Sequence, residues 1–193
     1  LWNRGLMMTI IWGTMFAGFQ LIVLSYLMLF LIEELELSAI MAGSLLAIAQ
    51  VSSIIARVSW GAISDFIFRG RRIVVLALIG LLTILWMLGA SLMSVGVPSI
   101  TVYLIAIVIG ISNLSYHGVL LTLIGEQAEP GQVGVTLGVA MLAFHIGMIA
   151  MPPLFGYLVD ISSSYSLGWR ATAVVALVCT LALLAFGRES QHR

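Results

Sequence analysis

Long apolar blocks fill most of the chain, and short polar stretches separate them. None of the blocks alternates between apolar and polar residues with a period of two, as a strand of a membrane barrel would. Each block is long enough to cross the ~30 Å hydrocarbon core as a helix, which pairs its backbone amides within its own segment. The pattern therefore predicts six transmembrane helices, over residues 5–32, 38–63, 72–93, 99–124, 132–159 and 168–186.

The composition also indicates a membrane protein, and the short links between its helices indicate a single bundle. Hydrophobic residues make up 62% of the 193 residues and charged residues only 8%, whereas soluble domains carry roughly 25% charged residues. Short links between successive helices favour antiparallel neighbours, so residues 1–193 are predicted to form a single all-α bundle. The formal net charge of zero argues against a nucleic-acid partner. The single cysteine, Cys179, cannot form an intrachain disulfide.

The basic residues indicate the orientation in the membrane. All of them are arginines, and with six spans most fall on one side, the densest group being the turn at residues 69–72. Only Arg170 lies on the opposite side. Because cytoplasmic loops carry the excess of arginine and lysine, we expect both termini in the cytoplasm, in a plasma or inner membrane.

The second half of the chain echoes the first. Gly61-x-x-x-Asp65 closes the second predicted helix, and Gly156-x-x-x-Asp160 closes the fifth at the same place in its trio. Three helices would then recur as three helices, with the second trio inverted because an odd number of spans separates the copies. The echo predicts a 3+3 inverted repeat. The alternative is a chance similarity between two helix ends.

Glycine and proline also stand out within the fifth predicted helix. Gly134 and Gly138 are four residues apart, and Pro152 and Pro153 lie near the far end. Small residues at this spacing allow a second helix to approach closely, and prolines bend a helix by removing backbone donors. We expect a packing and bending role for these residues.

The turn after the second predicted helix carries five residues in a characteristic order: Gly61, Asp65, Gly70, Arg71 and Arg72. This order resembles the loop signature of the major facilitator superfamily of secondary transporters. Phe66 stands where that family has a basic residue, and two additional residues separate Asp65 from Gly70. The resemblance implies that these five residues take part in gating. It implies that Asp65 closes the cytoplasmic gate by facing a helix N-terminus of an opposite half.

The resemblance covers essentially the whole chain, because six spans and the signature after the second span recur in each half of that family's fold. The chain begins at Leu1 and runs out after the sixth span, so it resembles the C-terminal half, helices seven to twelve. We therefore expect half of a major facilitator fold and a fragment of a twelve-helix protein. Such a half is expected to need its N-terminal half or a second copy as a partner.

Arg57 is the sharpest candidate for substrate binding. An ionisable residue inside a span costs at least ~2.5 kcal/mol on insertion scales, so its presence suggests a functional role. A guanidinium binds a carboxylate through two parallel hydrogen bonds, which suits an organic anion. The segment also resembles the eighth helix of monocarboxylate porters, with Ser53 where those have an acid. The alternative is that Arg57 reaches toward the cytoplasmic interface or braces a loop.

Polar residues in the fourth and first predicted helices could complete a site. In a straight helix Asn113 and His117 share a face because they are four residues apart. The first helix offers Gln20 and Tyr26. The amides would orient a polar substrate, and the imidazole could accept a coupling proton. Interhelical hydrogen bonds that only hold the bundle together are the alternative.

These observations predict a secondary active transporter of a small organic solute, such as a monocarboxylate, working by alternating access. No nucleotide-binding loop, metal-binding cysteine pair or protease motif is present, so neither a cofactor nor an enzymatic activity is expected. Possible partners are the lipid bilayer, the small-molecule substrate and a coupled proton or other ion. The alternatives are a non-catalytic six-helix substrate-binding subunit or channel, and an intramembrane enzyme whose catalytic groups converge from different helices.

Overall fold

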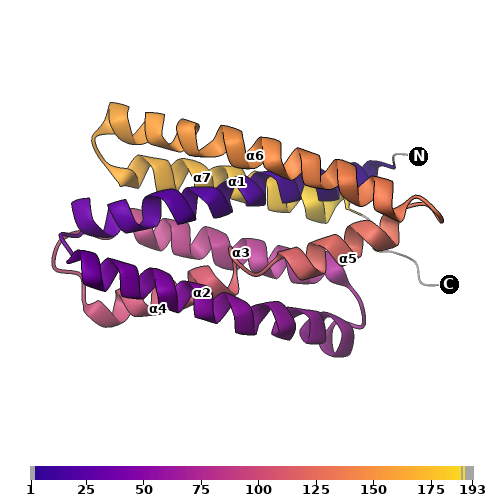
Figure 1. Cartoon of the computed structure of the whole chain (residues 1–193), viewed down its shortest axis with the longest axis horizontal. Coiled ribbons are helices and arrows are strands. Elements are labelled where there is room, and N and C mark those ends of the chain that lie inside the picture. Colours follow the sequence, from indigo (N-terminus) through magenta and orange to yellow (C-terminus); the bar gives the residue numbers. More distant parts are fainter. Residues whose placement is uncertain (1–2, 188, 190–193) are drawn as a thin grey trace.

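The structure is a computed structural model that describes residues 3–187 and residue 189, and the described residues form a bundle of helices without strands (Figure 1). Five of its helices are long and apolar enough to cross a membrane. The all-α membrane fold predicted from the sequence is confirmed. The elements in chain order are α1 (Arg4–Glu33), α2 (Ala39–Ala62), η1 (Ile63–Ile67), α3 (Arg72–Ser91), α4 (Ser99–Ile111), α5 (His117–Gln127), α6 (Val133–Ser162) and α7 (Tyr165–Phe186).

Polar side chains at the N-terminal ends of three helices explain where those helices begin. The side chain of Asn3 accepts a hydrogen bond from the amide of Leu6 at 2.7 Å, and Ser38 caps α2 in the same way. Ser164 caps α7, which therefore begins at Tyr165 rather than at residue 168 as predicted. Such caps satisfy backbone donors that have no partner within the helix.

The predicted span at residues 99–124 is not a continuous helix, and this part of the prediction is wrong. α4 ends at Ile111, residues 112–116 form a turn, and α5 begins at His117. Glycines and short polar residues are concentrated here, and they favour turns because their side chains compete for backbone groups. The hydroxyls of Ser112 and Ser115 donate to the carbonyls of Val108 and Ile111, both at 2.6 Å. We call residues 112–116 the α4–α5 turn.

The helices pack in pairs that join distant parts of the sequence. α1 lies against α6, α2 against α4, and α3 against α7 (Figure 1). Glycine makes two of these approaches possible, because a Cβ atom at Gly147 would lie 2.1 Å from the carbonyl oxygen of Thr14, and one at Gly110 would lie 2.2 Å from that of Ala49. Each approach joins the first helix of one trio to the second helix of the other. An inverted repeat would produce this pairing, but the repeat itself stays a prediction.

The glycines of α6 divide into two groups. Gly147 and Gly156 face neighbouring helices, whereas a Cβ atom at Gly134 or Gly138 would meet no atom of this chain within 4 Å. α6 continues as a helix through Pro152 and Pro153 to Ser162. The predicted close packing at Gly134 and Gly138 therefore does not occur within this chain.

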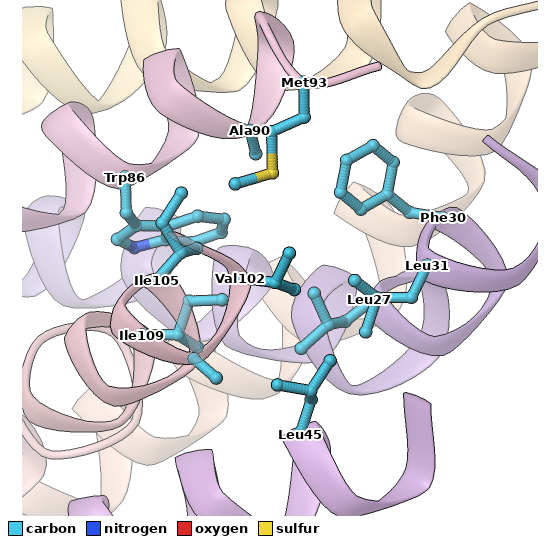
Figure 2. Close-up of a pocket in the computed structure, with 11 residues that line it drawn as sticks. Leu27, Phe30, Leu31, Leu45, Trp86, Ala90, Met93, Val102, Ile105 and Ile109 are labelled. Atoms are coloured by element: carbon cyan, nitrogen blue, oxygen red, sulfur yellow. The ribbon is translucent and has the colours of Figure 1, made fainter. Parts of the chain in front are cut away.

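Apolar side chains fill the interior but leave a small pocket beside α4. Figure 2 shows Leu27 and Phe30 from α1 and Trp86 from α3 around this pocket. α4 contributes one wall, which consists of Val102, Ile105, Ala106 and Ile109. The accessible space is only about 10 Å³, so α4 packs closely against its neighbours.

Candidate functional site

Two side chains of α2 bind the backbone where the fourth predicted span is broken. The guanidinium of Arg57 donates from Nε and Nη2 to the carbonyl oxygen of Leu114, at 3.3 and 3.2 Å. The indole Nε1 of Trp60, three residues further along α2, donates to the carbonyl oxygen of Ile111 at 2.5 Å. Carbonyls at a helix C-terminus lack partners within the helix. Arg57 and Trp60 therefore stabilise the end of α4 and the turn that follows.

Arg57 remains able to bind an additional group. Its side chain is exposed in this chain, and its bonds to Leu114 use two of its nitrogen atoms. A guanidinium has five N–H donors, so further donors are available. The ion pairs found among the described residues involve Arg72, and Arg57 has no acidic partner in that part of the chain. Arg57 is thus a positive charge within an apolar span that a carboxylate could neutralise.

Asn113 lies in the α4–α5 turn with its side chain fully buried. Neither its Nδ2 nor its Oδ1 atom has a hydrogen-bond partner. A buried amide without partners costs roughly 1–3 kcal/mol relative to a satisfied one. Such a group calls for a ligand, a water molecule or a different conformation of the turn in which its bonds are made.

Tyr116 and Gln20 form the other side of the turn. The Tyr116 hydroxyl donates to Oε1 of Gln20 at 3.5 Å, and its ring is fully buried against the rings of Trp12 and Phe16. The half-buried ring of His117 stacks on Tyr116 with 4.2 Å between the ring centroids. The turn thereby brings the imidazole of His117, from α5, and the amide of Gln20, from α1, close to the same break.

The structure brings together four of the five predicted substrate-binding residues, but for a different reason than the sequence suggested. Asn113 and His117 do not share a face of a straight helix, because the helix is interrupted between them. Both belong to the break, as do Arg57 and Gln20 through their contacts with Leu114 and Tyr116. Tyr26 lies elsewhere. Its ring packs on Phe155 of α6, with 5.0 Å between the ring centroids.

The predicted gating residues lie at the end of the bundle where α2 ends and α3 begins. The two additional residues in the signature fall where the backbone widens into the five-residue π-helix η1, and the amide of Phe68 bonds to the carbonyl of Ile63. The helix ends after η1, and the residues from Phe68 to Gly70 form a turn. Gly70 then adopts a φ of +78°, a left-handed conformation that glycine accepts most readily. Gly61 meets no neighbouring side chain, and Arg71 is exposed.

Arg72 is the centre of an ion network at this end. Its Nη1 lies 3.2 Å from Oδ1 of Asp65, and its Nε donates to both carboxylate oxygens of Glu126 at 2.9 Å. Asp65 is exposed and keeps one edge open to solvent, whereas Glu126 is largely covered. Arg72 thereby neutralises the charge of Asp65 and also joins α3 to α5.

The sequence analysis missed Trp60 and Glu126. Glu126 could have been found, because it is an acid at the end of the fourth predicted span, on the same side of the membrane as the basic turn. The break could have been suspected from the dense group of glycine, serine and asparagine in residues 110–118. Nothing in the sequence pattern identifies Trp60 as a donor to a carbonyl on another helix.

The opposite end of the bundle closes through hydrogen bonds between α1 and α7. Oε1 of Glu34 accepts from the hydroxyl of Ser164 at 2.8 Å, and Oε2 of Glu33 accepts from the hydroxyl of Tyr165 at 2.5 Å. No group of three or more metal-ligating side chains occurs in the part of the chain that the structure describes.

The apolar helices are those of an integral membrane protein, which has a broken helix with a charged residue beside it and an ion network at one end. The chain belongs to the Major Facilitator Superfamily, because the model of that family matches residues 2–193. Members of this family are membrane transporters that bind small molecules. A search of curated proteins found no significant match.

Proposed function

We propose that this chain is one half of a secondary active transporter that moves a small organic anion, such as a monocarboxylate, by alternating access. The observation that carries the proposal is Arg57, an exposed charge within an apolar span that has no acidic partner among the described residues. A charge facing lipid at this depth is unfavourable. The Arg57 side of α2 therefore borders a water-filled cavity in the working protein.

The residues around the α4–α5 turn would bind the substrate. Arg57 would bind the carboxylate, and the unsatisfied amide of Asn113 would bind a second polar group of the solute. Gln20 lies beside Tyr116, and His117, which stacks on Tyr116, would be the acceptor of a coupling proton. Tyr26 remains a prediction with less support, since its ring packs on α6.

A second bundle would complete the transporter. Within the most apolar 18-residue stretch of each helix, only 17% of the residues of α6 and 28% of those of α2 are buried in this chain. The corresponding share for α3 is 56%. The open glycines of α6 would allow another helix to approach that surface closely. We propose that an N-terminal half or a second copy of the chain covers these faces and that the substrate site lies between the two bundles.

The two ends of the bundle support a proposal for the cytoplasmic gate and for the orientation in the membrane. Asp65 is exposed beside Arg72, where it could face a helix of the other half and close the cytoplasmic side. The arginine-rich turn would lie in the cytoplasm, with both termini, in a plasma or inner membrane. An ion or proton gradient would drive transport.

Uptake of a radiolabelled monocarboxylate by the complete transporter in membrane vesicles tests this function. Arg57→Gln removes charge-assisted hydrogen bonds to a carboxylate, so uptake at low substrate concentration should fall about 100-fold. Arg170→Gln is the matched control, because Arg170 is also an exposed arginine in a span but lies at the start of α7, away from the turn. Equal uptake by the two variants would exclude Arg57 from the site and remove the basis for an anionic substrate.

A further inference from the structure

The hydrogen bonds of the α4–α5 turn do not satisfy all of its polar groups. Leu114 is held by a donor whose charge a carboxylate would bind more strongly, since charge-assisted pairs exceed bonds to neutral carbonyls. Asn113, in the same turn, is fully buried without partners. The turn thus contains a buried amide that could form hydrogen bonds in a second arrangement of residues 112–116.

We propose that the substrate carboxylate and the Leu114 carbonyl compete for Arg57, so that substrate binding releases the α4–α5 turn. This inference rests on the proposed function, because it assigns a regulatory consequence to the same anion site. In the unoccupied state Arg57 holds the turn closed on α2. When a carboxylate binds side-on through Nε and Nη2, the two nitrogen atoms that now hold Leu114, that carbonyl loses its donors. The turn then rearranges, and the Asn113 amide can form a replacement hydrogen bond.

Trp60 has the complementary role of keeping α4 attached to α2. Its indole donor binds Ile111, the last residue of α4, and it carries no charge that would draw it to the substrate. The two donors therefore behave differently when an anion arrives, since Arg57 changes partner and Trp60 does not. Trp60 is a positioning residue that confines the rearrangement to residues 112–116.

Amide hydrogen exchange followed by mass spectrometry tests the coupling in the complete transporter in nanodiscs. The reporter is a peptide covering residues 109–123, and the probes are acetate, L-lactate and benzoate, each compared with its neutral amide. Binding is measured separately as a shift in melting temperature. A carboxylate that binds should speed exchange in the turn about fivefold, the factor expected when one hydrogen bond is lost, and its amide should not.

The variants separate the roles of the two donors. Arg57→Gln should exchange fast without any probe and should no longer respond to carboxylates, whereas Arg170→Gln should behave as the parent protein does. Trp60→Phe should exchange faster throughout but keep its response. If a carboxylate raises the melting temperature while exchange in the turn stays constant, the competition is excluded and the proposed function stands. If none of the carboxylates binds, the anionic substrate and the competition fall together.

Discussion

Arg72 and Glu126 join the start of α3 to the end of α5 through a guanidinium that contacts both oxygens of one carboxylate. The Nη2–Oε1 distance is 2.8 Å, and the side chains are only 11% and 17% exposed. Asp65 binds the same guanidinium from the end of α2. One arginine thus holds together three segments at the end of the bundle that carries the family's signature.

Breaking this pair should destabilise the protein. Glu126→Gln removes the negative charge that answers a largely buried guanidinium, and the loss of one partner of such a pair costs roughly 3 kcal/mol. Thermal unfolding in detergent should report a clear decrease for Glu126→Gln and for Arg72→Gln. The double variant should lose less stability than the sum of the two single losses, because both changes remove the same Arg72–Glu126 pair. Additive losses in the double variant would contradict a direct pair.

Replacing Asn113 with an apolar residue should stabilise the protein and weaken transport. Asn113→Val replaces an unpartnered buried amide with an apolar side chain of similar size, so the melting temperature should rise, by an amount equivalent to about 1–3 kcal/mol. If Asn113 binds the substrate, uptake should fall about fivefold, the factor that one hydrogen bond to a polar solute represents. Ser94→Ala, an exposed change outside the bundle core, serves as the control. A less stable Asn113→Val variant would show that the amide has a partner in the working protein.

The two kinds of glycine on α6 should respond differently to alanine. Gly147→Ala would place a methyl group 2.1 Å from the Thr14 carbonyl and force α1 and α6 apart, which costs roughly 1–3 kcal/mol. Gly138→Ala meets no atom of this chain and should be neutral or stabilising in the isolated chain, by up to about 1 kcal/mol, since alanine favours a helix. Denaturation of the purified chain in detergent measures both effects. Equal losses would refute the close approach at Gly147.

The orientation can be tested by labelling single cysteines from outside the cell. With Cys179→Ser as the background, Asp160→Cys should react with a membrane-impermeant maleimide in intact cells, because this exposed position lies at the end opposite the basic turn. Arg69→Cys should react only after permeabilisation, since the turn is expected in the cytoplasm. The reverse labelling pattern would invert the proposed topology.

The α4–α5 turn marks the limit of what local patterns reveal. Hydropathy identifies residues 99–124 as a span, yet the same residues include Gly110, Ser112 and Asn113, whose side chains favour turns. A break at this depth is stable only because Arg57 and Trp60 supply donors from α2. The donors are more than fifty residues away along the chain. No short stretch of sequence therefore contains both the break and the side chains that stabilise it.

The sequence by itself determined that this protein is an all-α membrane bundle, where most helices lie, and that one turn carries the signature of its family, because hydrophobicity and turn-forming residues act locally. Only the tertiary structure decided that the fourth span is broken, that Arg57 binds a backbone carbonyl, and that Arg72 pairs with Glu126. These contacts join helices that are distant in the chain, and their existence depends on how the helices pack. The close approach of α4 to α2, permitted by Gly110, brings Arg57 and Trp60 within reach of the broken span.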